Sequence, residues 1–160
     1  MNNPIERLDQ LSLGELRQYF ISLKPPEPGS MQGVMRGYFI GPGWLKKLWG
    51  PTLAIFGLGG WRGKEIDLQG KAVNIVLRKG SIERRFPMYF VQEDSHLDKK
   101  PGLAFRYQSG NPFPWNLIVD ELRRIDEQHV IGMTLAEIGP LSRLAFPFVL
   151  QQKGSLDELR

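Results

Sequence analysis

Side chains able to do acid–base chemistry occur in three short clusters of the chain. Asp94-Ser95-His96 sets a carboxylate, a hydroxyl and an imidazole side by side, and paired acids occur at Asp120-Glu121 and Asp126-Glu127. Neighbours on an extended chain point to opposite faces, so residues 94–96 cannot form a relay among themselves, and we expect a solvated turn there. Arg123 and Arg124 lie between the two acidic pairs, which indicates that both pairs form surface ion pairs. Isomerase chemistry would need one buried carboxylate, and the sequence singles none out.

The chain offers little to a metal ion or a cofactor. It has no cysteine and two histidines, which excludes thiolate sites and an imidazole-rich site. Residues 57–63 are rich in glycine, but Arg62 stands where a dinucleotide fingerprint needs its third glycine, and a strand pattern follows instead of a helix. We therefore predict neither a cofactor nor a metal.

Trp61 lies in the pattern Gly59-Gly60-Trp61-Arg62-Gly63, at the point where strand-like sequence begins. Glycines on both sides allow neighbouring backbone to approach closely, and the indole is a large apolar group with one N–H that needs a partner. In a small barrel such a side chain would close one end.

A second aromatic cluster lies upstream, in residues 43–49. Two indoles, Trp44 and Trp49, flank the ammonium groups of Lys46 and Lys47. This combination suits a membrane interface, where the rings lie at headgroup depth and the lysines meet anionic lipid. The alternative is a short helix that buries Trp44, Leu48 and Trp49 against the barrel and leaves the lysines in water.

The elements that must position these residues are one firm helix and a series of strands. Ser12 to Glu15 matches a capping box, apolar residues then repeat at helical spacing, and Pro25-Pro26 follows, which predicts a helix over 12–23. Residues 29–63 hold ten of the eighteen glycines and are expected to be irregular, with a short helix around 44–49. Beyond Trp61, short runs alternate apolar and polar residues. Their apolar faces contain Val73, Ile75 and Leu77; Ile82, Phe86, Met88 and Phe90; Leu103, Phe105 and Tyr107; Trp115, Leu117 and Val119; Ile131, Met133 and Leu135; and Phe146, Phe148 and Leu150.

Several short strands without helices of βαβ length favour a closed antiparallel sheet over a parallel one. We predict an all-β, lipocalin-like antiparallel barrel preceded by one or two helices. The 160 residues form one domain, with a helical and irregular segment at 1–57, the barrel at 58–152 and a tail at 153–160.

A barrel of this size either is filled by its own side chains or holds one small ligand. The aromatic and methionine residues on the alternating faces suit both outcomes. We predict a small apolar or amphipathic ligand, with a fatty acid or related carboxylate as one candidate. The expected ligand-lining residues are Trp61, Phe86, Met88, Phe90, Phe105, Tyr107, Met133 and Phe148.

Two arginines are candidates for binding the polar head of such a ligand. In a regular strand, Arg84 would be on the same face as Phe86 and Met88, and Arg123 would be on the same face as Val119. Inside a barrel, either guanidinium would need a partner such as a ligand carboxylate. The alternative for Arg84, and equally for Arg123, is a place near a strand end, with the side chain pointing past the rim into water.

Gly59 to Gly63, followed by Lys64, resembles the motif of the GXWXG protein family, in which a second domain of unknown function usually follows. The run Asp120 to Asp126, then Gly132, then Phe146-Pro147-Phe148-Val149-Leu150 is similar to the closing pattern of that second domain. The resemblance covers most of residues 5–152 and implies a lipocalin-like barrel without an assigned activity. In lipocalins an arginine from the last strand covers the tryptophan, and here Arg143 would take that role.

The charge of the chain is uneven. Residues 36–85 carry ten Lys or Arg against three acids, within a total net charge of +4. A basic chain with 11% aromatic residues raises nucleic-acid binding as a third class, but the excess charge is small and the basic residues flank a turn, so we do not expect it. The first residues show no secretory or transit pattern, which predicts a cytoplasmic protein.

Overall fold

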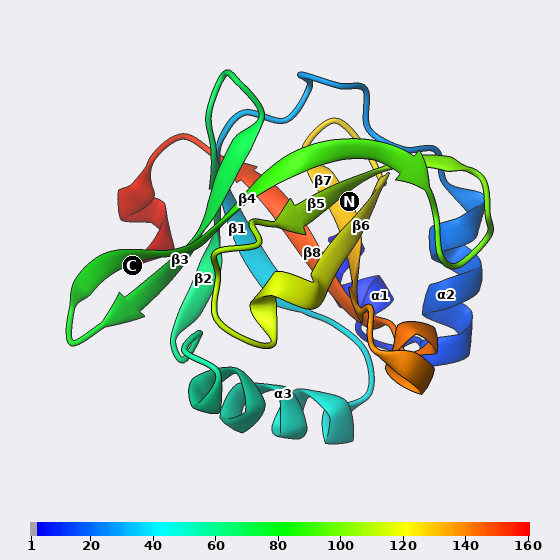
Figure 1. Ribbon diagram of the computed structural model, residues 1–160, viewed down its shortest axis with the longest axis horizontal. Helices are drawn as coiled ribbons and strands as arrows, with labels where there is room; N and C mark the ends of the chain where they lie inside the picture. Colours follow the sequence, from blue (N-terminus) through cyan, green and yellow to red (C-terminus); the bar gives the residue numbers. More distant parts are fainter. Residues whose placement is uncertain (1–2) are drawn as a thin grey trace.

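The computed structural model describes residues 3–160, and its centre is a closed antiparallel barrel of eight strands (Figure 1). Each strand pairs with the next along the chain, and the last strand pairs with the first. The strands are β1 Gly33–Phe39, β2 Trp61–Ile66, β3 Lys71–Arg78, β4 Ser81–Asp94, β5 Pro101–Tyr107, β6 Ile118–Arg124, β7 His129–Ala136 and β8 Phe146–Lys153. The predicted all-β barrel is confirmed.

Two helices precede the barrel and a third covers one of its ends. They are α1 Pro4–Leu8, α2 Leu13–Ser22 and α3 Gly43–Ile55, and three short 3₁₀ helices follow: η1 Trp115–Leu117, η2 Gly139–Arg143 and η3 Leu156–Leu159. The capping box at the start of α2 is formed, because Ser12 and Glu15 satisfy each other's backbone N–H groups. No helix among residues 3–160 is long and apolar enough to cross a membrane.

The helices occupy different places around the barrel (Figure 1). α1 and α2 pack on the outside of the wall through Leu8, Leu16 and Phe20, which contact outward-facing residues of β7 and β8. α3 lies across one end of the barrel, and its Leu53 joins the interior cluster. Met31, just before β1, joins the same cluster from another part of the chain.

Strand β1 is the main difference from the predicted organisation. It lies within residues 1–57, which we expected to be helical and irregular, and it closes the barrel by pairing with both β2 and β8. The expected tail at 153–160 is also ordered against the barrel, since η3 buries Leu159 on the outer wall. The strand expected to begin at Trp115 instead begins at Ile118, because residues 115–117 form η1.

A bulge in β4 decides which of its side chains face inward. Asn74 pairs with Arg85 and Ala72 with Met88, so β4 has one more residue than β3 between these pairs. The extra residue lies next to Pro87, where Phe86 has a φ of +54°. The alternation is therefore interrupted, and residues before and after the bulge with the same parity face opposite sides.

Candidate functional site

The barrel interior contains an ion pair that joins opposite walls. The Lys64 Nζ of β2 lies 2.9 Å from the Asp120 Oδ2 of β6, and both side chains are almost fully buried. In the closed order of eight strands, β2 and β6 are separated by three strands on either side. The contact therefore spans the lumen, which brings the two residues together although 56 positions separate them.

Each member of this ion pair has further hydrogen-bond partners, which come from β3 and β5 for Lys64 and from β7 for Asp120. Lys64 donates to the Asn74 Oδ1 at 2.9 Å and to the Tyr107 hydroxyl at 3.3 Å. Asp120 accepts a hydrogen bond from the Thr134 hydroxyl at 2.7 Å. The register explains the contacts with Asn74 and Thr134, since Lys64 is directly opposite Asn74 and Asp120 is directly opposite Thr134.

Aromatic rings complete the surroundings of the lysine. Its Nζ lies 5.4 to 5.8 Å from the ring centres of Phe105, Tyr107 and Phe148, within the range of cation–π attraction. Burial lowers the pKa of Lys64, and the nearby Asp120 charge opposes this shift. Burial also raises the pKa of the Tyr107 hydroxyl well above its usual value, and the Asp120 charge adds to the effect. Tyr107 is therefore neutral at physiological pH.

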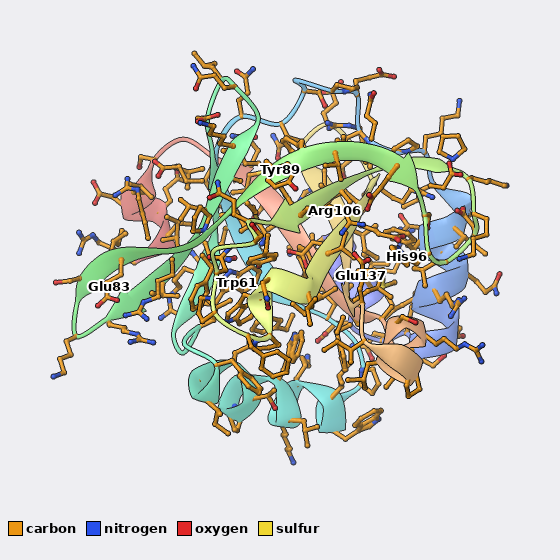
Figure 2. The ribbon with its side chains drawn as sticks, viewed as in Figure 1. Trp61, Glu83, Tyr89, His96, Arg106 and Glu137 are labelled. Carbon is orange, nitrogen blue, oxygen red and sulfur yellow. The ribbon has the colours of Figure 1, made fainter. Side chains whose placement is uncertain are left out.

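Trp61 belongs to the same network, which we call the interior polar cluster: Trp61, Lys64, Asn74, Tyr107, Asp120 and Thr134. The indole N–H donates to the Asn74 Oδ1 at 3.0 Å. Its ring packs against Phe39 and Phe148 and lies directly over Gly37. Figure 2 shows Trp61 near the end of the barrel that α3 covers.

A small cavity lies between the interior polar cluster and α3. Its volume is about 30 Å³, which is room for about two water molecules. Apolar side chains form the rest of its wall: Phe39, Trp49, Leu53, Leu58, Trp115 and Phe148. The Trp49 Nε1 is buried with no hydrogen-bond partner among residues 3–160. The cavity is therefore apolar on the α3 side and polar on the opposite side.

The predicted lining residues fall into three groups. Trp61, Tyr107 and Phe148 border the cavity. Phe86, Met88 and Phe105 face inward but fill space: Phe86 stacks on Trp115, Phe105 stacks on Phe90, and Met88 contacts Lys64. Phe90 also borders a separate cleft of about 230 Å³ near the turn between β2 and β3.

The interior positions expected for Arg84, Arg123 and Met133 are wrong. Arg84 precedes the β4 bulge, so it lies on the outer face, where it pairs with Glu65 at 2.6 Å. Arg123 also faces outward, pairing with Asp98 and lying under the ring of Phe20. Met133 packs against the helices outside the wall. Lys64, by contrast, is a cation buried in the barrel interior.

The acidic residues of β6 also differ from the expectation of surface ion pairs. Asp120 faces the lumen, and Glu121 is buried on the outer side of the wall. Glu121 accepts hydrogen bonds from the Ser95 hydroxyl and the backbone N–H of His96. The turn at 94–96 is therefore tied to the barrel and is not freely solvated. The Nδ1 of His96 contacts Glu121 as well, at 2.8 Å, and its Nε2 lies 4.0 Å from Glu137, in the outer group that Figure 2 labels.

Arg143 does not take the role that the lipocalin resemblance implies. It lies in η2 and borders a surface groove beside Leu13 and Arg17. The Trp61 ring contacts aromatic rings instead, and Trp61 begins the second strand of the barrel, not the first. Among residues 3–160, no group of three His, Asp or Glu side chains is close enough together to hold a metal ion.

The residues expected at a membrane are divided between the two sides of α3. Trp44 and Lys47 point outward and are exposed. Trp49 turns inward, where it stacks on Phe146 at 4.6 Å. Lys46 pairs with Asp9 at 2.6 Å. The expectation that all four form one surface is therefore wrong for Trp49, because the helix places it on the opposite face from Trp44.

Comparison with known proteins identifies the fold. No family model matches the chain, and no curated protein matches it in sequence. A solved crystal structure of a protein from Thermomonospora curvata is similar, with a TM-score of 0.73 and 18% sequence identity, over 94% of this chain and 93% of that chain. At this identity the similarity shows a shared barrel architecture.

Proposed function

We propose that the protein binds a small amphipathic molecule at the end of the barrel beneath α3. The observation that carries the proposal is the interior polar cluster at the border of an otherwise apolar cavity. A few fixed polar groups within apolar walls are typical of sites for small molecules. The buried Trp49 N–H supports the same conclusion, because it has no partner among residues 3–160 and borders the cavity.

Charge balance favours a neutral polar end on this molecule. Lys64 is already neutralised by Asp120 at 2.9 Å. A ligand carboxylate, such as that of a fatty acid, would bring a third charge into a low-dielectric interior and leave it unbalanced. A hydroxyl group would accept from Lys64 or Trp49 or donate to Asp120, and a carbonyl group would accept from Lys64 or Trp49, without that penalty. We therefore propose an alcohol, aldehyde or ketone as the ligand class, with a carboxylate as the alternative to be tested.

The volume of the cavity sets a requirement on ligand entry. A space of about 30 Å³ cannot hold an alkyl chain. Leu53 and Trp49 of α3 form the wall toward solvent, and α3 is flanked by Gly41 and Gly57, both with positive φ. These glycines accept backbone conformations that other residues resist, so they are suitable hinge positions. We propose that α3 moves outward when a ligand enters.

We propose in addition that the chain is a member of the GXWXG family. The motif lies at the start of β2, and Gly63 has a φ of +149° with the Met35 carbonyl so near that an added Cβ would lie 1.9 Å from it. Only glycine fits there, which supports reading the pattern as a structural motif. Lys64, the residue after the motif, would then connect the motif to the interior polar cluster through its ion pair with Asp120.

The binding test uses three eight-carbon probes that differ in their polar end: 1-octanol, octanal and octanoate. We expect the neutral probes to raise the melting temperature at pH 7.5 and octanoate to have the smaller effect. The variant Lys64→Met/Asp120→Asn removes both charges, and should lower the affinity for 1-octanol by about tenfold, since hydrogen bonds to charged groups contribute about 1.5 to 3 kcal/mol.

Arg84→Gln is the matched control, because it removes an outward-facing cation and should leave binding unchanged. Native mass spectrometry of the purified protein would show any molecule already retained. If no probe shifts the melting temperature, and no small molecule accompanies the protein, the proposed binding function is wrong. Tighter binding of octanoate than of octanol would refute the neutral ligand class while keeping the binding site.

A further inference from the structure

Helix α3 has two apolar faces. Its inner face carries Leu45 and Leu53, which are buried, and Leu53 joins the cluster inside the barrel. Its outer face carries Trp44, Leu48 and Ile55, which are 61%, 61% and 78% exposed. Spacings of four and seven residues place the three outer side chains on one stripe of the helix. The barrel therefore uses only one of the two faces.

Apolar side chains next to the helix extend this stripe. Phe56, at the end of α3, is partly exposed, and its carbonyl accepts a hydrogen bond from the Trp115 indole at 2.7 Å. That bond fixes the loop before η1 against the helix, and Phe113 of this loop is 67% exposed. We call Trp44, Leu48, Ile55, Phe56 and Phe113 the α3 surface. Large exposed apolar side chains gathered in this way often mark a place of interaction.

The surroundings of the α3 surface are basic. Residues 43–55, which form α3, contain Lys46 and Lys47 and no Asp or Glu. Lys47 is exposed beside the stripe, and the Arg78 guanidinium donates to the Gly57 carbonyl at the C-terminal end of the helix. Neither has an ion-pair partner among residues 3–160, whereas Asp9 pairs with Lys46 and Glu83 pairs with Arg85. The charges that remain are positive, so the surface favours an anionic partner.

We propose that the α3 surface docks onto anionic phospholipid membranes. Trp44, Leu48 and Ile55 would enter the boundary between headgroups and acyl chains, and Lys47 and Arg78 would lie among the phosphates. A second copy of the chain fits less well, because pairing two α3 helices would bring together two segments that carry cations and no acids. This inference goes beyond ligand binding and stands on the outer face of α3 alone.

The test is co-sedimentation with vesicles, without added ligand. Vesicles of phosphatidylcholine with 30% phosphatidylserine are compared with phosphatidylcholine alone, at 0.05 and 0.5 M NaCl. We expect partitioning onto the anionic vesicles that decreases with salt. Each basic residue near an anionic surface contributes about 1 kcal/mol, so Lys47→Glu should weaken partitioning by about fivefold or more. Trp44→Ser/Leu48→Ser should weaken it by about tenfold or more, because it removes most of the buried apolar area.

Matched control variants lie away from α3, near the turn between β2 and β3. Leu68 is 79% exposed, and Lys71 is an exposed cation at the start of β3. Leu68→Ser and Lys71→Glu should partition like the parent protein. All four variants change exposed side chains, and unchanged circular dichroism and melting temperature would show that the fold is kept.

Three results would overturn the proposal. The first is no sedimentation with anionic vesicles, and the second is equal loss in the control variants. The third is a dimer in sedimentation equilibrium that Trp44→Ser/Leu48→Ser dissociates, together with no vesicle binding, which would assign the surface to a second copy. Because no ligand is used, failure here leaves the binding test of the barrel interior unaffected.

Discussion

Lys64 and Asp120 form a buried ion pair, in which the stability of each charge depends on the presence of the other. Both side chains are taken out of water, which costs several kcal/mol for each ion, and their attraction with the bonds to Asn74 and Thr134 offsets that cost. The pair is therefore a weak source of net stability. Removing one partner alone is a different matter, because the other charge remains buried.

A double-mutant cycle measures this contact. Lys64→Met should destabilise the protein by about 3 to 5 kcal/mol, since the Asp120 carboxylate loses its counter-charge in the barrel interior. Lys64→Met/Asp120→Asn should recover most of that loss, because the new amide keeps the bond from Thr134 and no charge remains. Urea unfolding of the parent, the two single variants and the double variant gives the coupling energy. A double variant as unstable as the sum of the singles would show that the two residues do not interact.

A second ion pair lies on the outer side of the wall and is sensitive to acid. The Asp98 side chain is 10% exposed and faces Arg123, which is 2% exposed. Burial by itself would raise the pKa of Asp98. The hydrogen bond from the Lys100 backbone N–H and the charge of Arg123 together outweigh this effect, so the pKa is lowered. A lowered pKa in the folded state means that the unfolded chain binds the proton more readily, so stability falls as the pH falls.

The variant Asp98→Asn tests this pH dependence. The stability difference between parent and variant should be constant above about pH 5, and should shrink as the pH falls below about 3.9, the usual pKa of an unfolded Asp. Above pH 5 the loss should be about 2 kcal/mol, since the bond to a charged Arg123 is weakened. The pKa of Asp126 is also lowered, but its contribution is present in both proteins and cancels. A difference that stays constant down to pH 2.5 would contradict the assignment.

The residues of the site are only partly predictable from the sequence. Trp61 stands out by its glycines, and Tyr107 and Phe148 by alternation, and all three border the cavity. Arg123 and Arg124 make Asp120 resemble a surface residue, although Ile118 and Leu122 on its own face indicate an inward position. The parity of Arg84 misleads, because one extra residue at the β4 bulge reverses the side to which it points. The contact of Lys64 with Asp120 depends on barrel closure, which no local pattern encodes.

Strands β1 and β2 meet where a glycine accommodates the key indole. A Cβ added to Gly37 of β1 would lie 2.1 Å from the Trp61 ring. Gly37→Ala should therefore displace the indole, break its bond to Asn74 and destabilise the protein by more than about 2 kcal/mol, a typical cost of overpacking a core. Gly14→Ala in α2 is the matched control, because no atom lies within 4 Å of its added Cβ.

Thermal and urea unfolding of the two alanine variants would decide this point. The control should be slightly more stable than the parent, by about 0.5 to 1 kcal/mol, because alanine loses less backbone entropy in a helix. The protein has four tryptophans, so fluorescence does not report on Trp61 alone. The NMR signal of the Trp61 indole N–H is the specific measurement of this site. A Gly37→Ala protein with unchanged stability and an unchanged indole signal would refute the close packing.

At the level of elements, regular periodicity predicts well and glycine-rich sequence does not. The helix expected over 12–23 is α2, because its capping box and apolar spacing are local features. β1 is not recognisable from its sequence, because Gly33 and Gly37 dilute its alternation and the surrounding glycines indicate an irregular segment. The glycines are there for packing: Gly37 makes room for Trp61, which lies 24 residues later in the chain.

The barrel as a whole depends on a single strand from the first third of the chain. β1 pairs with β2 along one side and β8 along the other, so it joins the beginning of the sheet to its end. Without it, seven strands would leave two unpaired edges and an open interior around Lys64 and Asp120. Open edges lack hydrogen-bond partners and promote aggregation. The protein should therefore unfold as one cooperative unit, with no separate barrel domain at 58–152.

Fragment complementation tests this dependence. The fragment 58–160 should show no cooperative urea transition by circular dichroism and should self-associate, because β2 and β8 lack their common neighbour. Adding the fragment 1–57 should restore a cooperative transition, since it supplies β1 together with α3, which covers the end of the barrel. The same fragment with Gly37→Ala should complement poorly, because β1 must fit against Trp61 to close the sheet. Cooperative unfolding of 58–160 alone would instead show that the sheet is stable without closure, and the interior ion pair would then have to form in an open structure.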